Sequence, residues 1–456
     1  MAKKGIIITG IIIIIGALIF SGCAKTEAPA PSSPTTPTPA PSEKIPTEIL
    51  LGDVACYTGG AATFGVNAFG TEAAVEDINN EGGIYIKEYD KKLPVRWICL
   101  DNQSDPNKVA PLTEDLILKE KVHFIGPHNE TPPFAVGRAV MCEKYKIAGL
   151  VGTGPIETTM AMEEAAGGCP HAYWYGMSIG TPPSPPHPDA ENLGILAGPT
   201  YMNGLADMAK GTNKKVALFA SDDVDGRSWY IANAGLLKEQ GYECYNADKQ
   251  FGLFPLGTTD FTPIVTEWKK AGCDLLLGNS PATEAGTMWK QCHTLGFQPK
   301  VAIMGRAANF YTDISSWGEG MAEGICFELF WTDKVPGVGI GGTTAASLFQ
   351  RFYDKTGLPM AQGIGYDYAG AQALFDAIER AGTLNSDDLI KALGETDMMT
   401  MDGRWVFDKE TRFRSFPVSM GQWHRTDNPW VWEPKVIFSH SDFLKKEADL
   451  IPIPYD

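Results

Sequence analysis

Short apolar runs alternate with helix-like segments along most of this sequence, and that alternation restricts the possible folds more than any other feature. Glu48–Ala55, "LPVRWICLDN" (93–102), "VHFIGPHN" (122–129) and "KIAGLVGTG" (146–154) have the length and composition of buried strands. Between the first two, "AFGTEAAVEDINNEGGI" (68–84) has helical spacing and a glycine stop. These segments predict a parallel sheet with helices on both faces.

A second series of the same kind follows a proline-rich break at Thr181–Pro188. Its expected strands are "KKVALFASDD" (214–223), "YECYNADKQ" (242–250), "CDLLLGNSP" (273–281) and "KVAIMGRA" (300–307), with helices at Arg227–Gln240 and Thr283–Leu295. About 410 residues are enough for two core-bearing units. The sequence therefore predicts two α/β lobes.

The expected strands run out into loops of small, polar or aromatic residues: "CYTGGAATF", "GPHNETPP", "GTGPIETT", "SDDVDG", "GNSPAT" and "GRAANF". Strand ends need turn residues in any protein. In open parallel sheets, however, ligands bind beyond the carboxyl ends of the strands. We therefore expect two such edges to face each other across a binding cleft.

The N-terminus has the pattern of an export signal. Lys3 and Lys4 precede an isoleucine-rich run, Gly5–Phe20, and the run closes on "FSGC". This closing motif resembles the lipobox of bacterial lipoproteins, which favours Leu where Phe20 stands, and the resemblance implies acylation of Cys23. An uncleaved single-pass anchor is the alternative. Both place the rest of the chain outside the cytoplasm. On the lipoprotein interpretation it is lipid-anchored to the cell membrane or faces the periplasm.

Composition narrows the partners. Ala24–Pro46 is rich in Pro, Ala, Ser and Thr, so it predicts an extended tether rather than a folded unit. A formal charge of −17 argues against nucleic acid as a partner, because nucleic acid rewards clusters of Lys and Arg. Eight cysteines follow Cys23; Cys142 with Cys169 is the first disulfide to expect, although several cysteines sit in strand-like runs as small buried hydrophobes.

The order of several longer motifs resembles the branched-chain amino acid binding proteins of ABC importers. The matching segments are 68–84, "DNQSDP" (101–106), "GYDYAGAQALFDAIERAG" (365–382), "SDDLIKAL" (386–393) and "RWVFDKETRFRSFPVSMGQW" (404–423). The resemblance implies a type I periplasmic binding protein fold: two Rossmann-like lobes with parallel sheets, joined by a three-strand hinge. It also implies a small-molecule ligand and an ABC permease as partners, no cofactor and no catalytic residue.

The domain organisation expected on this basis has five parts. Residues 1–22 are the lipoprotein signal peptide, and 23–46 the lipidated proline-rich tether. Residues 47–172 and 334–416 form lobe 1, residues 173–333 and 417–440 form lobe 2, and 441–456 are a C-terminal tail. The insert 181–202, near the first crossover between lobes, is expected to be a proline-stiffened surface loop.

The resemblance implies first-lobe binding residues at matching positions. Phe64 corresponds to the aromatic residue that covers the ligand. Asn129, Glu130 and Thr131 correspond to the loop that offers a hydroxyl and backbone amides, with Thr131 the nearest hydroxyl; Thr153 and Gly154 correspond to the next loop. Fixed donors of this kind suit a carboxylate. Phe64 could instead belong to the core, and the threonines could instead cap helices.

The second lobe departs from the family pattern. Asp225 stands where relatives often place a tyrosine, and Ser280 lies in the loop "GNSPAT". Arg306 stands where relatives place the acid that accepts an ammonium group, which an arginine cannot do. Two interpretations follow. Either Arg306 faces the cleft and selects an organic or aromatic acid, or it pairs internally with Asp225 or Glu130 and an amino acid ligand remains suitable.

Enzyme motifs are weak in this sequence. "GVGIGG" (337–342) formally matches G-x-G-x-x-G, but "DKVP" separates it from the preceding apolar run, so we read it as a loop. No H-E-x-x-H or C-x-x-C occurs, and the seven histidines lack metal-ligand spacing. We therefore expect a binding protein that works by hinge closure, with no metal. It would serve an ABC importer or, alternatively, sense a ligand through a signalling partner.

Overall fold

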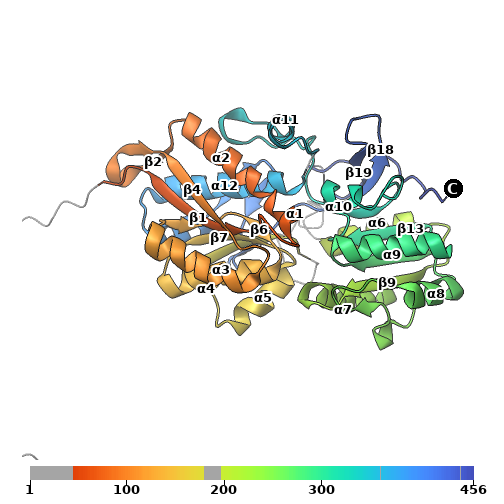
Figure 1. Ribbon diagram of the computed structural model, residues 1–456. Helices are drawn as coiled ribbons and strands as arrows, with labels where there is room; N and C mark the ends of the chain where they lie inside the picture. The colour runs from red at the N-terminus through yellow and green to blue at the C-terminus, as the bar shows by residue number, and fades with distance from the viewer. Residues whose placement is uncertain (1–44, 179–196, 360, 442, 456) are drawn as a thin grey trace, which may run out of the picture. The chain divides into compact units, whose positions relative to one another are not determined.

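The computed structural model describes residues 45–178, 197–359, 361–441 and 443–455. The first sheet is parallel throughout (Figure 1). Its order is β17 (Phe413–Ser415), β8 (Ala172–Gly176), β7 (Gly149–Thr153), β5 (Phe124–Ile125), β1 (Ile49–Ala55) and β4 (Val95–Asp101), with β6 (Asn129–Glu130) also paired to β7. This sheet and the helices packed on it make lobe 1.

Helices cover both faces of the first sheet. One face carries α2 (Ala68–Asn80) and α12 (Gly363–Ala381), and the other carries α3 (Pro106–Asp115), α4 (Pro132–Tyr145) and α5 (Ile156–Ala165). The pattern of β1 explains this arrangement. Ile49 and Leu51 are buried toward α2 and α12, whereas Val54 is buried toward α3. Smaller elements complete the lobe: α1 (Ala62–Gly65), α11 (Ala345–Thr356), α13 (Ser386–Gly394), β2 (Ile84–Ile86), β3 (Lys91–Leu93), β15 (Asp397–Thr400) and β16 (Gly403–Val406).

The second sheet is parallel at one end and antiparallel at the other. Its order is β10 (Glu243–Cys244), β9 (Lys215–Ser221), β12 (Leu275–Asn279), β13 (Val301–Gly305), β14 (Cys326–Leu329), β18 (Ser419–Arg425) and β19 (Trp432–Ser439), with β11 (Leu253–Phe254) paired to β9. The antiparallel strand is β18, which pairs antiparallel with both of its neighbours, β14 and β19. On one face lie α6 (Ala197–Met208) and α7 (Val224–Glu239), on the other α8 (Thr262–Ala271) and α9 (Ala282–Leu295), with α10 (Tyr311–Ser315) nearby. Together these elements make lobe 2.

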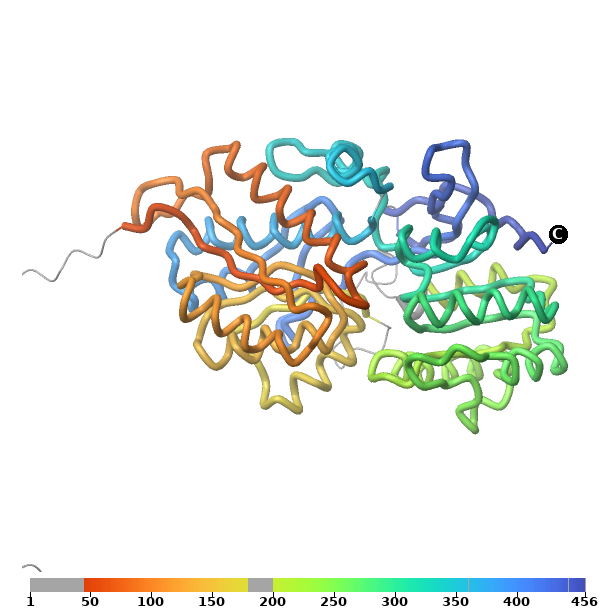
Figure 2. The backbone as a smooth tube through the Cα atoms, in the orientation of Figure 1, coloured from red at the N-terminus to blue at the C-terminus, as the bar shows by residue number. Residues whose placement is uncertain are grey.

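The chain passes between the two sheets three times, from β8 to α6, from β14 to α11 and from β17 to β18. Figure 2 shows the result: the light-blue α12 runs among the orange and yellow N-terminal segments, and the green middle of the chain lies apart from them. The expected lobe boundary at residue 172 falls on the first residue of β8, and β8 pairs with β7 in the first sheet as far as Gly176. The proline-rich insert lies mostly outside the described residues, and its last residues begin α6.

Most expected strands and helices are present, with two informative differences. Of 242–250 only Glu243–Cys244 is a strand, because Asn246 and Gln250 adopt left-handed backbone angles and turn the chain. Helix α7 begins three residues earlier than expected, since the Asp223 carboxylate caps it by accepting from the Gly226 amide at 2.8 Å. Pro111 lies inside α3.

The last residues are not a loose end. The Gln422 side chain on β18 exchanges two 2.9 Å hydrogen bonds with the Ile451 backbone. Leu444 and Ile453 are buried, and the Tyr455 ring packs on Trp289 of α9. The segment 443–455 therefore belongs to the core of lobe 2.

The structure also bears on the expected disulfide and on membrane-spanning helices. The structure describes eight cysteines, and all are free thiols, so the expected pairing of Cys142 with Cys169 is not formed. Both of these side chains are buried, which agrees with their alternative role as small hydrophobes. Among the residues the structure describes, no helix is both long and apolar enough to cross a bilayer. Cys23 and the preceding signal lie outside the described residues.

Candidate functional site

A pocket with about 70 Å³ of free space lies between the two lobes. Lobe 1 and its connections contribute Phe64, Asn129, Glu130, Thr131, Thr153, Gly154, Pro155, Met177, Gln362, Tyr366 and Phe416; lobe 2 contributes Asp225, Trp229, Asn279, Arg306, Asn309, Phe310, Glu328 and Phe330. Many of these residues follow the carboxyl ends of parallel strands, where the sequence places a binding edge.

The lobe 1 wall presents two helix starts to the pocket. Thr131 precedes α4, whose first two residues are prolines, and its hydroxyl does not cap the helix. Pro155 precedes α5. The Thr153 hydroxyl bonds to the hydroxyl of Thr159 at 2.7 Å, so it is held within the wall. Helix N-termini carry partial positive charge, which favours an anionic group. The two prolines of α4 have no N–H to donate, and the Ile156 amide of α5 already donates to the Met177 carbonyl at 2.8 Å, so the helix dipoles act here without these first amides.

A buried ion network holds this wall in place from behind. His128 contacts the Asp367 carboxylate on α12 at 2.7 Å and the Glu130 carboxylate at 3.2 Å, and none of the three side chains is exposed. Asp367 also accepts from the Asn129 amide at 3.0 Å. Burial alone would lower the pKa of His128, but the two carboxylates outweigh it and raise the pKa to about 10. His128 is thus a charged core residue rather than the solvated loop histidine that its sequence position favours.

Glu130 lines the pocket, but its carboxylate already has hydrogen-bond partners within the protein. Its carboxylate accepts from the Cys56 amide at 2.5 Å and the Asn102 side chain at 3.4 Å, besides contacting His128. Burial alone would raise the pKa of Glu130, but the hydrogen bond and charge of His128 lower it. Glu130 therefore remains ionised and anchors the wall.

On the lobe 2 wall Arg306 is neutralised by its neighbours. Its guanidinium contacts the Asp223 carboxylate at 2.9 Å and the Asp225 carboxylate at 3.4 Å. Asp225 lies in the first turn of α7, and burial raises its pKa to about 6, although the charge of Arg306 opposes the rise. Arg306 reaches the pocket and also pairs internally with Asp225, as the second interpretation from the sequence expects.

Glu328 on β14 is the one acid among the lining residues that the sequence reasoning missed. It is 5% exposed, and among the described residues its carboxylate has no side-chain hydrogen-bond partner and no ion pair; its one hydrogen bond is to its own backbone amide. Burial raises its pKa to about 7. Its carboxylate lies over Gly305, where a Cβ atom would come within 2.8 Å of it. An acid inside the apolar run "GICFELF" was the available signal, because acids are rarely fully buried without a partner.

Two amide oxygens near Glu328 are also unsatisfied. The Oδ1 atoms of Asn279 and Asn309 are buried and have no hydrogen-bond partner among the described residues. Both side chains line the pocket. Buried acceptors without donors are costly, so a ligand that brings N–H groups would satisfy them.

Aromatic rings close the pocket. The Phe64 ring of α1 meets the Phe310 ring edge-to-face across the lobes at 5.0 Å. Tyr366 and Phe416 stack at 4.9 Å on another side, with Phe330 beside them. These rings exclude water and offer apolar surface to a ligand.

Eight of the nine ligand-binding residues proposed from the sequence line this one pocket. Ser280 does not; it is buried, and its hydroxyl donates to the Pro281 carbonyl at 3.2 Å. Among the described residues, no group of three or more His, Cys, Asp or Glu side chains is arranged to hold a metal ion.

One enzyme-like motif was overlooked in the sequence. Residues 176–180, "GMSIG", match the G-x-S-x-G pattern of serine hydrolases. Ser178 follows β8, and its hydroxyl donates to the Glu157 carboxylate at 2.8 Å. The hydrolase arrangement requires a histidine as the partner of this serine, so the contact does not support that chemistry.

Comparison with known proteins agrees with a binding role. Residues 48–428 match the model of a family described as periplasmic binding protein. A Leu/Ile/Val-binding protein homolog from Brucella melitensis is 24% identical over 365 residues, covering 77% of this chain and 82% of that protein.

Two solved structures are similar in fold. One is a solute binding protein of an ABC transporter from Rhodopseudomonas palustris, in complex with 3,4-dihydroxybenzoic acid (18% identity, TM-score 0.65, 90% of this chain and 99% of that chain). The other is a branched-chain amino acid transporter substrate binding protein from Streptococcus pneumoniae, in complex with isoleucine (18% identity, TM-score 0.63, 86% and 99%). These relatives are solute-binding proteins and not enzymes. The chain described here folds into two α/β lobes, and the family model matches most of its length. The chain therefore belongs to the periplasmic binding protein family.

Proposed function

We propose that this protein is the extracytoplasmic solute-binding component of an ABC importer, and that its ligand is a small zwitterion of the amino acid type. The ligand would bind in the interlobe pocket through Phe64, Asn129, Thr131, Gly154, Asp225 and Glu328, with Glu130, Thr153 and Arg306 supporting the walls. Hinge closure would retain it, and an ABC permease would receive it. Anchoring through a lipid on Cys23 would keep the protein beside that permease.

The ligand class is inferred from a difference between the two walls of the pocket: one suits a negative group and the other a group that donates hydrogen bonds. The starts of α4 and α5 favour a carboxylate on the lobe 1 side. The unpaired Glu328 carboxylate and the unsatisfied oxygens of Asn279 and Asn309 lie on the other side. An ammonium group has three N–H donors, which is the number of these acceptors.

The pairing of Arg306 removes the main objection to such a ligand. A free guanidinium would repel an ammonium group, but Asp223 and Asp225 surround this one with two carboxylates. With Glu328 included, acids exceed bases on the lobe 2 wall. An organic acid without an amine would leave Glu328 buried, charged and unpaired.

A thermal-shift screen of refolded, ligand-free protein beginning at Ile45 tests this proposal. The panel holds amino acids, their N-acetyl derivatives, aromatic acids and dicarboxylates. A ligand at ~100 times its dissociation constant adds roughly 2.7 kcal/mol to the free energy of unfolding. We expect stabilisation by at least one amino acid and none by its N-acetyl derivative, which keeps the carboxylate but loses the ammonium group.

Stabilisation by aromatic acids or dicarboxylates, with none by amino acids, would contradict the zwitterion and favour the first interpretation of Arg306. The partner is tested separately by cross-linking the ligand-bound protein in membranes. Recovery of a transporter permease supports import, and recovery of a signalling receptor in its place would contradict it.

A further inference from the structure

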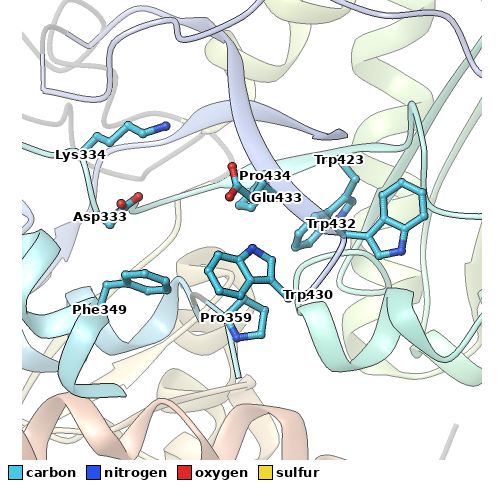
Figure 3. Close-up of a pocket in the computed structure, with 9 residues that line it drawn as sticks. All are labelled: Asp333, Lys334, Phe349, Pro359, Trp423, Trp430, Trp432, Glu433 and Pro434. Carbon is cyan, nitrogen blue, oxygen red and sulfur yellow. The ribbon is translucent and has the colours of Figure 1, made fainter. Parts of the chain in front are cut away.

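A second cavity, of about 140 Å³, lies at the joint between the lobes and shares no residue with the interlobe pocket (Figure 3). It is lined by Asp333, Lys334, Phe349, Pro359, Trp423, Trp430, Trp432, Glu433 and Pro434. A cavity of roughly 150 Å³ is large enough for a benzene ring. The space therefore suits a small organic group rather than a single water molecule.

Aromatic rings form most of its walls. Trp430, in the turn between β18 and β19, packs edge-to-face on Phe349 of α11 at 6.3 Å and on Tyr353 at 5.1 Å. Trp423 and Trp432 are buried in the hairpin itself. The Trp423 indole N–H donates to the Ala308 carbonyl at 2.8 Å, which fixes that ring. Rigid rings around a small space are the usual setting for cation–π binding.

Acidic side chains outnumber basic ones by one around the cavity. Lys334 pairs with Glu447 at 3.1 Å, and Lys435 pairs with Glu433 at 2.7 Å. Asp333 is partly buried and forms no hydrogen bond or ion pair within the described part of the chain, but its charge interacts with that of the adjacent Lys334, which also lines the cavity. In Figure 3 the carboxylates of Asp333 and Glu433 lie on the same side of the Phe349 and Trp430 rings. The cavity thus combines aromatic rings with two acids, Asp333 and Glu433, against one base, Lys334, which leaves a net negative charge.

We propose that this cavity is a second ligand site, for a small organic ammonium ion. The cation would rest against Trp430 and Phe349, with Asp333 as its counter-ion. An anion would meet the two carboxylates, and a neutral apolar molecule would leave Asp333 unpaired. The site does not depend on the identity of the ligand in the interlobe pocket.

The position of the cavity gives its occupant contacts with both lobes. Phe349 belongs to lobe 1, Trp430 belongs to the lobe 2 hairpin, and Asp333 lies on the segment that runs from β14 to α11. A bound cation would therefore favour whichever lobe arrangement keeps these three parts together.

Isothermal titration calorimetry of the full-length protein with choline, and with its neutral isostere 3,3-dimethylbutan-1-ol, tests the site. We expect choline to bind roughly tenfold more tightly than the isostere. Asp333→Asn and Trp430→Ala should each weaken choline binding by about five- to thirtyfold. Asp333→Asn keeps the side-chain shape, so it remains decisive if Trp430→Ala does not fold.

Two matched controls define the outcome. Asp427→Asn removes an exposed acid from the same turn as Trp430, outside the cavity, and should leave choline affinity unchanged. Glu328→Gln, in the interlobe pocket, should also leave it unchanged. Equal binding of choline and its isostere, loss of binding only in Glu328→Gln, or no choline binding at millimolar concentration would each overturn the proposal.

Discussion

Glu328 is the residue at which stability and ligand binding oppose each other. Among the described residues its buried carboxylate has no side-chain partner, and burial raises its pKa to about 7, well above the ordinary value of 4.5. Because the folded-state pKa is raised, folding is more favourable below pH 4.5, and this advantage is lost as the pH rises through about 7. The empty protein therefore carries a cost at neutral and higher pH that a cationic ligand group would relieve.

Glu328→Gln should separate these two effects. At pH 8 the variant removes a buried charge, so we expect the free energy of unfolding of the empty protein to rise by about 2–3 kcal/mol. Its affinity for the amino acid ligand should fall at least tenfold, as measured by calorimetry. In the wild-type protein, affinity should fall as the pH is lowered from 8 to 5.5, and the variant should show less of this dependence. A variant that binds as tightly as wild type would exclude Glu328 from the ammonium site.

His128 is expected to make the stability of the protein depend on pH, which a surface histidine with an unshifted pKa would not do. Its folded-state pKa of about 10 exceeds the ordinary value of 6.5, so its stabilising effect is complete below pH 6.5 and is lost as the pH rises toward 10. His128→Gln should lower the free energy of unfolding by on the order of 3 kcal/mol at pH 7, because it leaves Glu130 and Asp367 unpaired. Urea denaturation should show this difference shrinking by pH 10. His440→Gln, at a partly exposed position bonded to Asn203, is the control and should show no such trend.

At the scale of elements, lobe 1 depends on the close approach of α2 and α12. A Cβ atom on Gly70 would lie 2.1 Å from the Ile364 carbonyl oxygen and 2.7 Å from the Tyr368 amide nitrogen. These are backbone atoms, so the clash cannot be relieved by a side-chain rotation. Only glycine lets the two helices pack at this distance.

Gly70→Ala should therefore lower the free energy of unfolding by about 2–3 kcal/mol in urea denaturation. Gly235→Ala is the matched control: it lies within α7, is exposed, and a Cβ atom there would meet nothing within 4 Å. That variant should be neutral or slightly stabilising, since alanine favours helix by up to about 1 kcal/mol over glycine. If both variants lose the same stability, helix contact at Gly70 is not the cause.

The sequence predicted elements well where local pattern and burial agree. Strand Ile49–Ala55 and helix Ala68–Asn80 follow directly from apolar runs and helical spacing. It failed at 242–250, where local turns at Asn246 and Gln250 override an apparently strand-like composition. It also gave no sign that β18 runs antiparallel to its neighbours β14 and β19, because strand direction depends on contacts far apart in the sequence.

At the scale of the whole molecule, the lobes touch across the pocket through Phe64 and Phe310. If these rings hold the closed form, Phe310→Ala should weaken ligand binding about five- to tenfold and raise the radius of gyration of the ligand-bound protein in small-angle scattering. Phe64→Ala should do the same, and the double variant should cost less than the sum of the two. Additive effects would show that the rings act separately rather than as a contact between the lobes.

The site was predictable wherever a strand end brings a residue to the binding edge. This rule located Thr131, Thr153 and Arg306 at one pocket. It missed Glu328 because that residue lies within a strand and not at its end, so the signal of an acid inside an apolar run went unused. It also could not decide how Arg306 is neutralised, since Asp223 is 83 residues away in the chain.

The packed C-terminal segment has a practical consequence for handling this protein. The Ile451 backbone exchanges two hydrogen bonds with the Gln422 side chain, and the Tyr455 hydroxyl donates to the Pro299 carbonyl at 2.5 Å. The Ile453 backbone packs so closely on Gly324 that a Cβ atom there would lie 2.9 Å from it. A purification tag, fluorophore or fusion partner joined directly after the last residue would pull on the second lobe at its sheet. A flexible spacer at that end, or a truncation that keeps Tyr455, should let a tag or fluorophore be attached without disturbing hinge closure.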